Sequence, residues 1–214
     1  MDSATSRLFP ATACHRVRLG LRLIFFALFP LYLIASDNWR GRPAPTDAFL
    51  SMVTYATILS MFLASTGLVI LLISSREVGG KYLLLFSLIA GVFAQLGALG
   101  IRHGLVSAFA GTPVFAIGIA SLVSLVFFLR RIARDLQRAD LVKRTARWFQ
   151  LCAITLVCSV ISSGLSIFFP ELESGVIWRV TQVLIICMFA QFVALQGGVD
   201  NAIRQISEIE DVFS

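Results

Sequence analysis

Histidine is scarce in this sequence, and its scarcity excludes several kinds of membrane chemistry. The chain has only two histidines, His15 and His103, and both lie outside its long apolar runs. A helical bundle with so few histidines cannot hold a haem through paired histidines or build a histidine-rich zinc site. The serine cluster at 162–163 also lacks the histidine base that an intramembrane serine protease needs. We therefore expect no catalytic residues, no metal and no cofactor.

Acidic side chains are absent from the apolar runs. All 12 Asp and Glu residues fall in polar segments or tails, so a relay that depends on a carboxylate deep in the membrane lacks its central group. The chain also has no CxxC pair for thiol exchange. Three of its four cysteines lie in apolar runs, and we interpret Cys152, Cys158 and Cys187 as small buried apolar residues.

Charge is low throughout, since 14% of residues are charged and 57% are hydrophobic. Soluble domains have about 25% charged and about 45–50% apolar residues. A membrane-spanning helix needs about 20 apolar residues, and six runs have that length or approach it. They are 20–36, 49–74, 82–101, 105–129, 148–169 and 175–196. The sequence predicts an all-α, polytopic bundle of six transmembrane helices over residues 1–196, with an amphipathic tail over 197–214. The first run lacks a small-x-small cleavage pattern, so we expect a retained helix.

Basic residues indicate the orientation, because they are enriched in cytoplasmic loops. With both termini in the cytoplasm, the outer segments hold only four basic residues out of 18, namely Arg40, Arg42, Arg102 and Arg179. Trp39 and Trp178 then fall at the outer boundary, and Tyr82 and Trp148 at the inner boundary, where aromatic rings are favoured. We predict a multi-pass protein of a bacterial cytoplasmic membrane.

The segment 130–147 is the only long polar stretch in the interior of the chain. We expect its basic residues to contact anionic lipid headgroups or an acidic partner. They are Arg130, Arg131, Arg134, Arg138, Lys143, Arg144 and Arg147. The pattern predicts two helix extensions joined by a turn near Ala139-Asp140, with Asp140 as the N-cap. The net charge of +6 reflects this orientation and lipid contact, so we expect no nucleic-acid partner.

Small residues predict a close helix pair in the middle of the chain. Ala90, Ala94 and Ala98 recur at four-residue spacing, as do Ser107 and Gly111. Small residues let helix backbones approach in lipid. Because only residues 102–104 separate the two predicted spans, we expect a tight antiparallel hairpin. We also expect Pro113 to bend the fourth span.

Four polar side chains lie within the predicted spans: Gln95, Gln182, Gln191 and Arg179. The glutamines can hydrogen-bond between helices, or they can line a polar pathway. Arg179 lies about one turn inside the sixth span, where its long side chain can reach outwards to water. A single cavity that joins the three glutamines would favour the pathway.

The last segment has an apolar stripe at a/d spacing, formed by Val199, Ala202, Ile206, Ile209 and Phe213. Acidic residues occupy much of the opposite face, and Gly197-Gly198 predicts a hinge before it. The stripe spans two heptads, fewer than a coiled coil requires. We expect this tail to pack on the bundle, on the basic segment or on another subunit.

Three functions remain open. We favour a non-enzymatic structural or accessory subunit of a membrane complex, in contact with the lipid bilayer and with a protein partner or further copies of itself. The first alternative is a small-solute channel or transporter lined by the glutamines. The second is a membrane sensing module that acts through a cytoplasmic partner.

Overall fold

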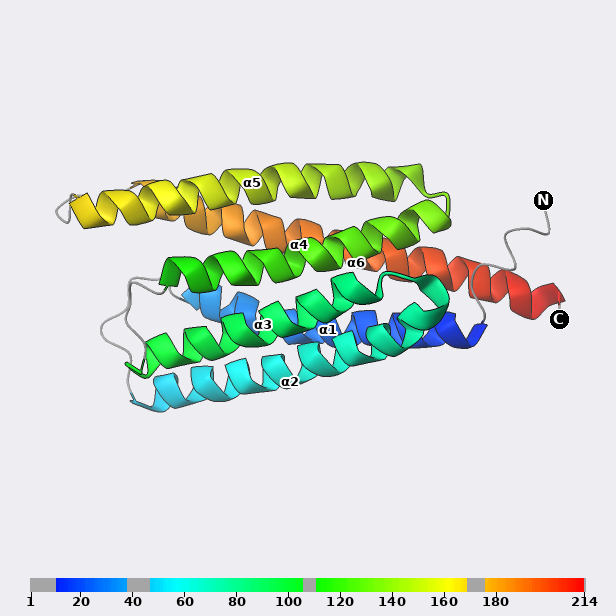
Figure 1. The fold of residues 1–214 in the computed structure, drawn as a ribbon, viewed down its shortest axis with the longest axis horizontal. Helices are drawn as coiled ribbons and strands as arrows, with labels where there is room; N and C mark the ends of the chain where they lie inside the picture. Colours follow the sequence, from blue (N-terminus) through cyan, green and yellow to red (C-terminus); the bar gives the residue numbers. More distant parts are fainter. Residues whose placement is uncertain (1–10, 38–46, 106–110, 169–175, 214) are drawn as a thin grey trace.

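The computed structural model is a bundle of six long α-helices within the residues it describes, 11–37, 47–105, 111–168 and 176–213 (Figure 1). Its side chains are described over 13–27, 51–75, 79–101, 103–105, 113–161 and 179–205. The helices are α1 (Ala11–Asp37), α2 (Asp47–Val78), α3 (Lys81–Arg102), α4 (Gly111–Asp135), α5 (Ala139–Phe168) and α6 (Val176–Phe213). The all-α bundle predicted from the sequence is confirmed.

Four of these helices are long and apolar enough to cross a membrane in the part of the chain that the structure describes. Their apolar segments are Ser51–Ser75, Lys81–Ile101, Pro113–Asp135 and Arg179–Gln205. The protein is therefore a membrane-embedded helical bundle. Both α1 and α5 begin with several basic residues, and their membrane spans remain predictions.

The helices lie side by side along the long axis, and each packs on its neighbour in the chain (Figure 1). Helices α1 and α6 also pack on each other and close the bundle. The start of α1, the α2–α3 turn, the α4–α5 turn and the end of α6 all lie at one end of the molecule (Figure 1). We call this the cytoplasmic end, after the orientation predicted from the basic residues.

The α2–α3 turn needs glycine at two positions. Gly79 and Gly80 have φ angles of 80° and 86°, a left-handed conformation that costs residues with a Cβ about 1–2 kcal/mol. Both glycines also lie against α4. A Cβ on Gly79 would be 2.6 Å from the Arg131 guanidinium, and one on Gly80 would be 2.9 Å from the Phe128 ring. The turn therefore fixes the register of α2 and α3 against α4.

The α4–α5 turn lies earlier than the sequence predicted. Helix α4 ends in a Schellman motif, in which the Arg138 N–H donates to the Ala133 carbonyl and Gln137 is left-handed with a φ of 55°. The first bonds of α5 run from the Leu141 and Val142 N–H groups to the Arg138 carbonyl. The predicted N-cap, Asp140, is wrong, because Asp140 lies within the first turn of α5.

Helix α4 begins later than the sequence predicted. Helix α3 ends at Arg102, and Gly104 closes a second Schellman motif with a φ of 69°. Leu105, the predicted first residue of the fourth span, is not helical, and helix α4 begins at Gly111, so this predicted start is wrong. Pro113 is then in the first turn of α4, where it removes no helical hydrogen bond, and the predicted bend there is wrong. The predicted contact residue Ser107 lies outside the described residues.

Small residues bring helices together at two places. Gly20 of α1 and Gly67 of α2 face each other so closely that a Cβ on either would lie within 2.8 Å of the other's carbonyl oxygen. The α3–α4 pair is joined by two serines. The Ser87 hydroxyl donates to the Ser121 carbonyl at 2.9 Å, and the Ser121 hydroxyl donates to the Ser87 carbonyl at 2.7 Å. The predicted antiparallel α3–α4 packing is present.

The apolar core is densest near the cytoplasmic end, where α4, α5 and α6 meet. Trp148 is fully buried there against Phe192, and its indole N–H donates to the Met188 carbonyl at 3.1 Å. Trp148 therefore does not face the lipid, whereas Tyr82 is exposed at this end. The depth of both rings at the inner boundary remains a prediction. The interpretation of the membrane cysteines as buried residues is confirmed for Cys152, but Cys158 is only half-buried and Cys187 is exposed.

Candidate functional site

The predicted basic cluster lies at the cytoplasmic end, on the end of α4, the turn and the start of α5. Its exposed members are Arg131, Arg134, Lys143, Arg144 and Arg147, whereas Arg130 and Arg138 are partly buried. The Arg130 Nε is buried and has no hydrogen-bond partner among the described residues. The cluster therefore presents most of its positive charge outwards, as contact with anionic groups requires.

One member of the cluster is engaged within the chain. The Arg138 guanidinium donates to both carboxylate oxygens of Asp140, at 3.0 and 3.1 Å. This paired hydrogen bond lowers the pKa of the Asp140 carboxyl and raises the pKa of Arg138. Arg138 also reaches Gln205 of α6, at 3.5 Å from its side-chain oxygen. The turn and α6 are therefore level with each other at residues 138 and 205.

An α1–α6 junction, which the sequence analysis missed, joins the two ends of the chain. Asp200 of α6 accepts a hydrogen bond from the Arg18 Nε at 3.0 Å and lies 3.5 Å from the Arg22 guanidinium. One helical turn away, the buried Gln196 amide donates to the Leu21 carbonyl of α1. These pairs are more than 170 residues apart in the sequence, and no local pattern identifies them.

The tail predicted at 197–214 is the continuation of α6. The helix runs unbroken from Val176 to Phe213, so the predicted hinge at Gly197-Gly198 is wrong. Two residues of the predicted stripe, Val199 and Ala202, are buried in the bundle, and Ile203 beside them is buried as well. The side chains of Ile206, Ile209 and Phe213 lie outside the described residues.

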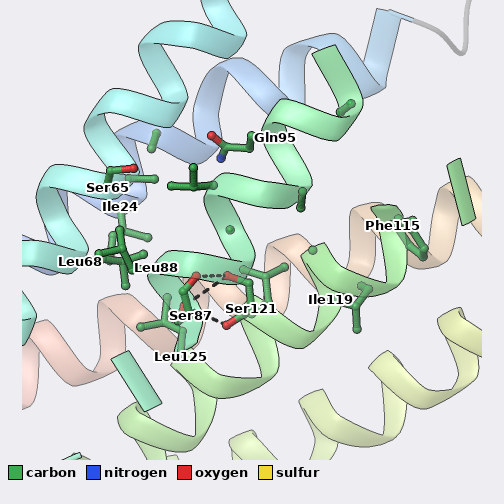
Figure 2. Close-up of a pocket in the computed structure, with 18 of the residues that line it drawn as sticks. Ile24, Ser65, Leu68, Ser87, Leu88, Gln95, Phe115, Ile119, Ser121 and Leu125 are labelled. Carbon is green, nitrogen blue, oxygen red and sulfur yellow. Dashed lines mark hydrogen bonds between the residues drawn. The ribbon is translucent and has the colours of Figure 1, made fainter. Parts of the chain in front are cut away.

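A cavity of about 320 Å³ lies between α1, α2, α3, α4 and α6 (Figure 2). Three helices line it over similar lengths, from Thr57 to Leu68 on α2, from Ser87 to Ala98 on α3 and from Val114 to Leu125 on α4. Each stretch has twelve residues, and the eleven rises of about 1.5 Å between its ends correspond to about 16 Å. The cavity is therefore an elongated space parallel to the helices, within the segments able to cross a membrane.

Most polar groups that line the cavity are already satisfied. The Thr57 hydroxyl donates to the Val53 carbonyl at 2.8 Å, and Ser87 and Ser121 bond to each other at the end of the cavity away from Gln95 (Figure 2). Gln95 differs, because its side-chain oxygen is buried and has no hydrogen-bond partner among the described residues. It projects from α3 towards α1 and α2 (Figure 2). The lining is thus mostly apolar, and it includes a buried acceptor that no described residue satisfies.

The structure does not bring the predicted intramembrane polar residues together. Gln95 lines the cavity, whereas Gln182 is half-buried elsewhere on α6, and Gln191 and Arg179 are exposed. A single cavity that joins the three glutamines would favour a polar pathway, and this cavity does not join them. Gln196, at the end of the sixth predicted span, is buried. Sequence reasoning overlooked its hydrogen bond to the Leu21 carbonyl of α1.

Comparison with protein-family models, with curated proteins and with solved structures finds no match to this chain.

Proposed function

We propose that this chain is a non-enzymatic accessory subunit of a complex in a bacterial cytoplasmic membrane, and that it contacts a cytoplasmic protein partner through the end of α6. The observation that carries the proposal is the length of α6 beyond the bundle. Gln205 is level with the α4–α5 turn through its contact with Arg138. Residues 206–213 continue the helix for about 12 Å more (Figure 1).

The direction of this extension favours a protein partner over the lipid surface. The end of α6 continues along the bundle axis and passes the starts of α1 and α3 (Figure 1). A helix that leaves the membrane along the axis of its own span moves away from the headgroups. Its sequence also carries Glu208, Glu210 and Asp211, which anionic headgroups repel. The basic cluster is the part of this end suited to the lipid.

The base of the extension is firmly held. Val199 and Ile203 are buried in the bundle, and Asp200 is paired with Arg18 and Arg22. A segment that is already ordered loses less conformational entropy when it binds. The apolar stripe continues into this segment as Ile206, Ile209 and Phe213, which is the pattern by which an amphipathic helix binds a groove. The partner should therefore offer an apolar groove with basic edges.

The test compares wild type with the double variant Ile206→Ser and Ile209→Ser, purified from native membranes in mild detergent. We expect a complex of this chain with one other protein in fixed stoichiometry, measured by light scattering and mass spectrometry, and its loss in the double variant. Asn201→Ser is the matched control, because Asn201 is exposed on the same helix. A particle that contains only this chain, or a complex that survives the double variant, would overturn the proposal.

A further inference from the structure

We infer that the cavity is a binding site for a lipid-soluble molecule with a single hydrocarbon chain and a hydroxyl or amine group that donates a hydrogen bond to Gln95. This inference goes beyond the accessory function, because it concerns the membrane half of the protein. It rests on the shape of the cavity, on its lining and on the Gln95 oxygen, which has no hydrogen-bond partner among the described residues.

The shape fits an extended chain. The volume of about 320 Å³ extends along about 16 Å of three helices, so the space suits an extended hydrocarbon chain better than a compact molecule. The length is about half of the ~30 Å hydrocarbon core, which is the depth of one leaflet. Small residues, including Gly91, Ala94 and Gly118, line the part of the cavity where α3 and α4 approach each other.

The lining favours an apolar occupant. Leu68, Leu88 and Ile119 contribute apolar surface, and the hydroxyls of Thr57, Ser87 and Ser121 are bonded within the protein. Water needs two to four polar partners to remain in a cavity, and apolar cavities stay dry and take up apolar molecules. A hydrocarbon chain from the bilayer is such an apolar molecule. Ala98, at the end of the cavity near Gln95, is exposed and gives access from the lipid side.

Gln95 specifies the polar group. Its buried carbonyl oxygen lacks a donor, and such an atom is unfavourable until a donor reaches it. The hydroxyls of Thr57, Ser87 and Ser121 already have acceptors, and no donor reaches the Gln95 oxygen among the described residues, so the occupant can supply the missing donor. A plain alkane fills the space and leaves the oxygen unpaired, whereas an alcohol or amine fills the space and also donates a hydrogen bond to the oxygen. The site should therefore prefer an alcohol to an alkane of equal length.

The test uses dodecanol with a diazirine at the end of its chain, and the protein in lipid nanodiscs. After illumination, mass spectrometry should find the label on cavity residues of α2, α3 and α4. Unlabelled dodecanol should compete about three- to tenfold better than dodecane, which is the factor for one hydrogen bond. In Gln95→Leu, this preference should disappear while labelling of the cavity persists.

Two alanines of α2 provide the matched pair for occupancy. Ala64 lines the cavity and Ala56 does not, and both are half-buried. Ala64→Leu should reduce labelling of the cavity severalfold, whereas Ala56→Leu should leave it unchanged. If Ala64→Leu does not fold, Ala98→Leu replaces it, because Ala98 also lines the cavity at an exposed position. Label confined to lipid-facing residues such as Phe62 and Phe93 overturns the site, and equal competition by dodecanol and dodecane overturns the role of Gln95.

Discussion

The α1–α2 crossing gives the sharpest test of the packing. In Gly67→Ala, the new Cβ would lie 2.7 Å from the Gly20 carbonyl oxygen and 2.9 Å from the Ile24 side chain. The first obstacle is backbone, so a rotamer change cannot relieve the clash, and the two helices must separate. Overpacking of this kind costs about 1–3 kcal/mol. We therefore expect the folding equilibrium constant to fall by about 5- to 150-fold.

The assay is thermal or denaturant-induced unfolding of the purified protein in detergent, followed by near-ultraviolet circular dichroism, since helices persist in the unfolded membrane protein. Gly118→Ala is the control. Its Cβ would make an ordinary 3.5 Å contact with the Ala94 Cβ, and the substitution improves helix propensity by up to about 1 kcal/mol. It should leave stability unchanged or raise it. If Gly67→Ala is as stable as wild type, the backbones of α1 and α2 are not in contact and the reasoning is refuted.

Three further predictions use the same unfolding measurement. Asp200→Asn removes two ion pairs with α1 and should lower the unfolding free energy by about 1–3 kcal/mol. Arg22→Gln alters a side chain that is 57% exposed and should change the unfolding free energy by less than about 0.5 kcal/mol. Equal effects of the two variants would contradict the junction. Ser121→Ala should cost about 0.6–1.7 kcal/mol because it loses bonds between helices, but Thr155→Ala, whose hydroxyl bonds only within its own helix, should be close to neutral. The pKa of the Asp140 carboxyl is lowered by its hydrogen bond with Arg138. The contribution of this pair to the unfolding free energy is therefore complete above the ordinary carboxyl pKa of about 3.9. It is lost as the pH falls through the lowered value. In Asp140→Asn, this loss of unfolding free energy at acidic pH should disappear. If the unfolding free energy of the variant falls at acidic pH as in wild type, the pair contributes nothing.

The helices could be predicted because each depends on a local property of the sequence. A long apolar run must satisfy its backbone hydrogen bonds internally, so 49–74 and 82–101 could become little else than helices. The glycine pair at 79–80 marks the turn between them for an equally local reason, since both residues need a positive φ. Such features do not depend on what the rest of the chain does.

The errors concern features that depend on the neighbouring helix. Trp148 has the depth expected of a boundary aromatic residue, but this depth does not say which face of α5 packs on α6. In the structure the Trp148 face does, and the Trp148 N–H donates to the Met188 carbonyl. The start of α4 was placed too early because residues 105–110 are apolar enough to continue a span, although α3 ends in a Schellman motif beside them. The ion pair of Arg18 with Asp200 joins opposite ends of the chain. Only the closed arrangement of the bundle brings these groups together.

The glycines of α6 show how the same residue type can indicate flexibility in a sequence and close approach in a structure. A Cβ on Gly198 would lie 2.7 Å from the Leu141 side chain, whereas Gly197 has open space. Gly198 therefore lets α5 approach α6 next to the buried Val199. Because Gln196 and Asp200 bind α1 on either side of this pair, the helix is held where a hinge was expected. The same helix lines the cavity at Met188 and ends beyond the bundle. The α1–α6 junction therefore lies between the part of α6 that lines the cavity and the part that projects beyond the bundle.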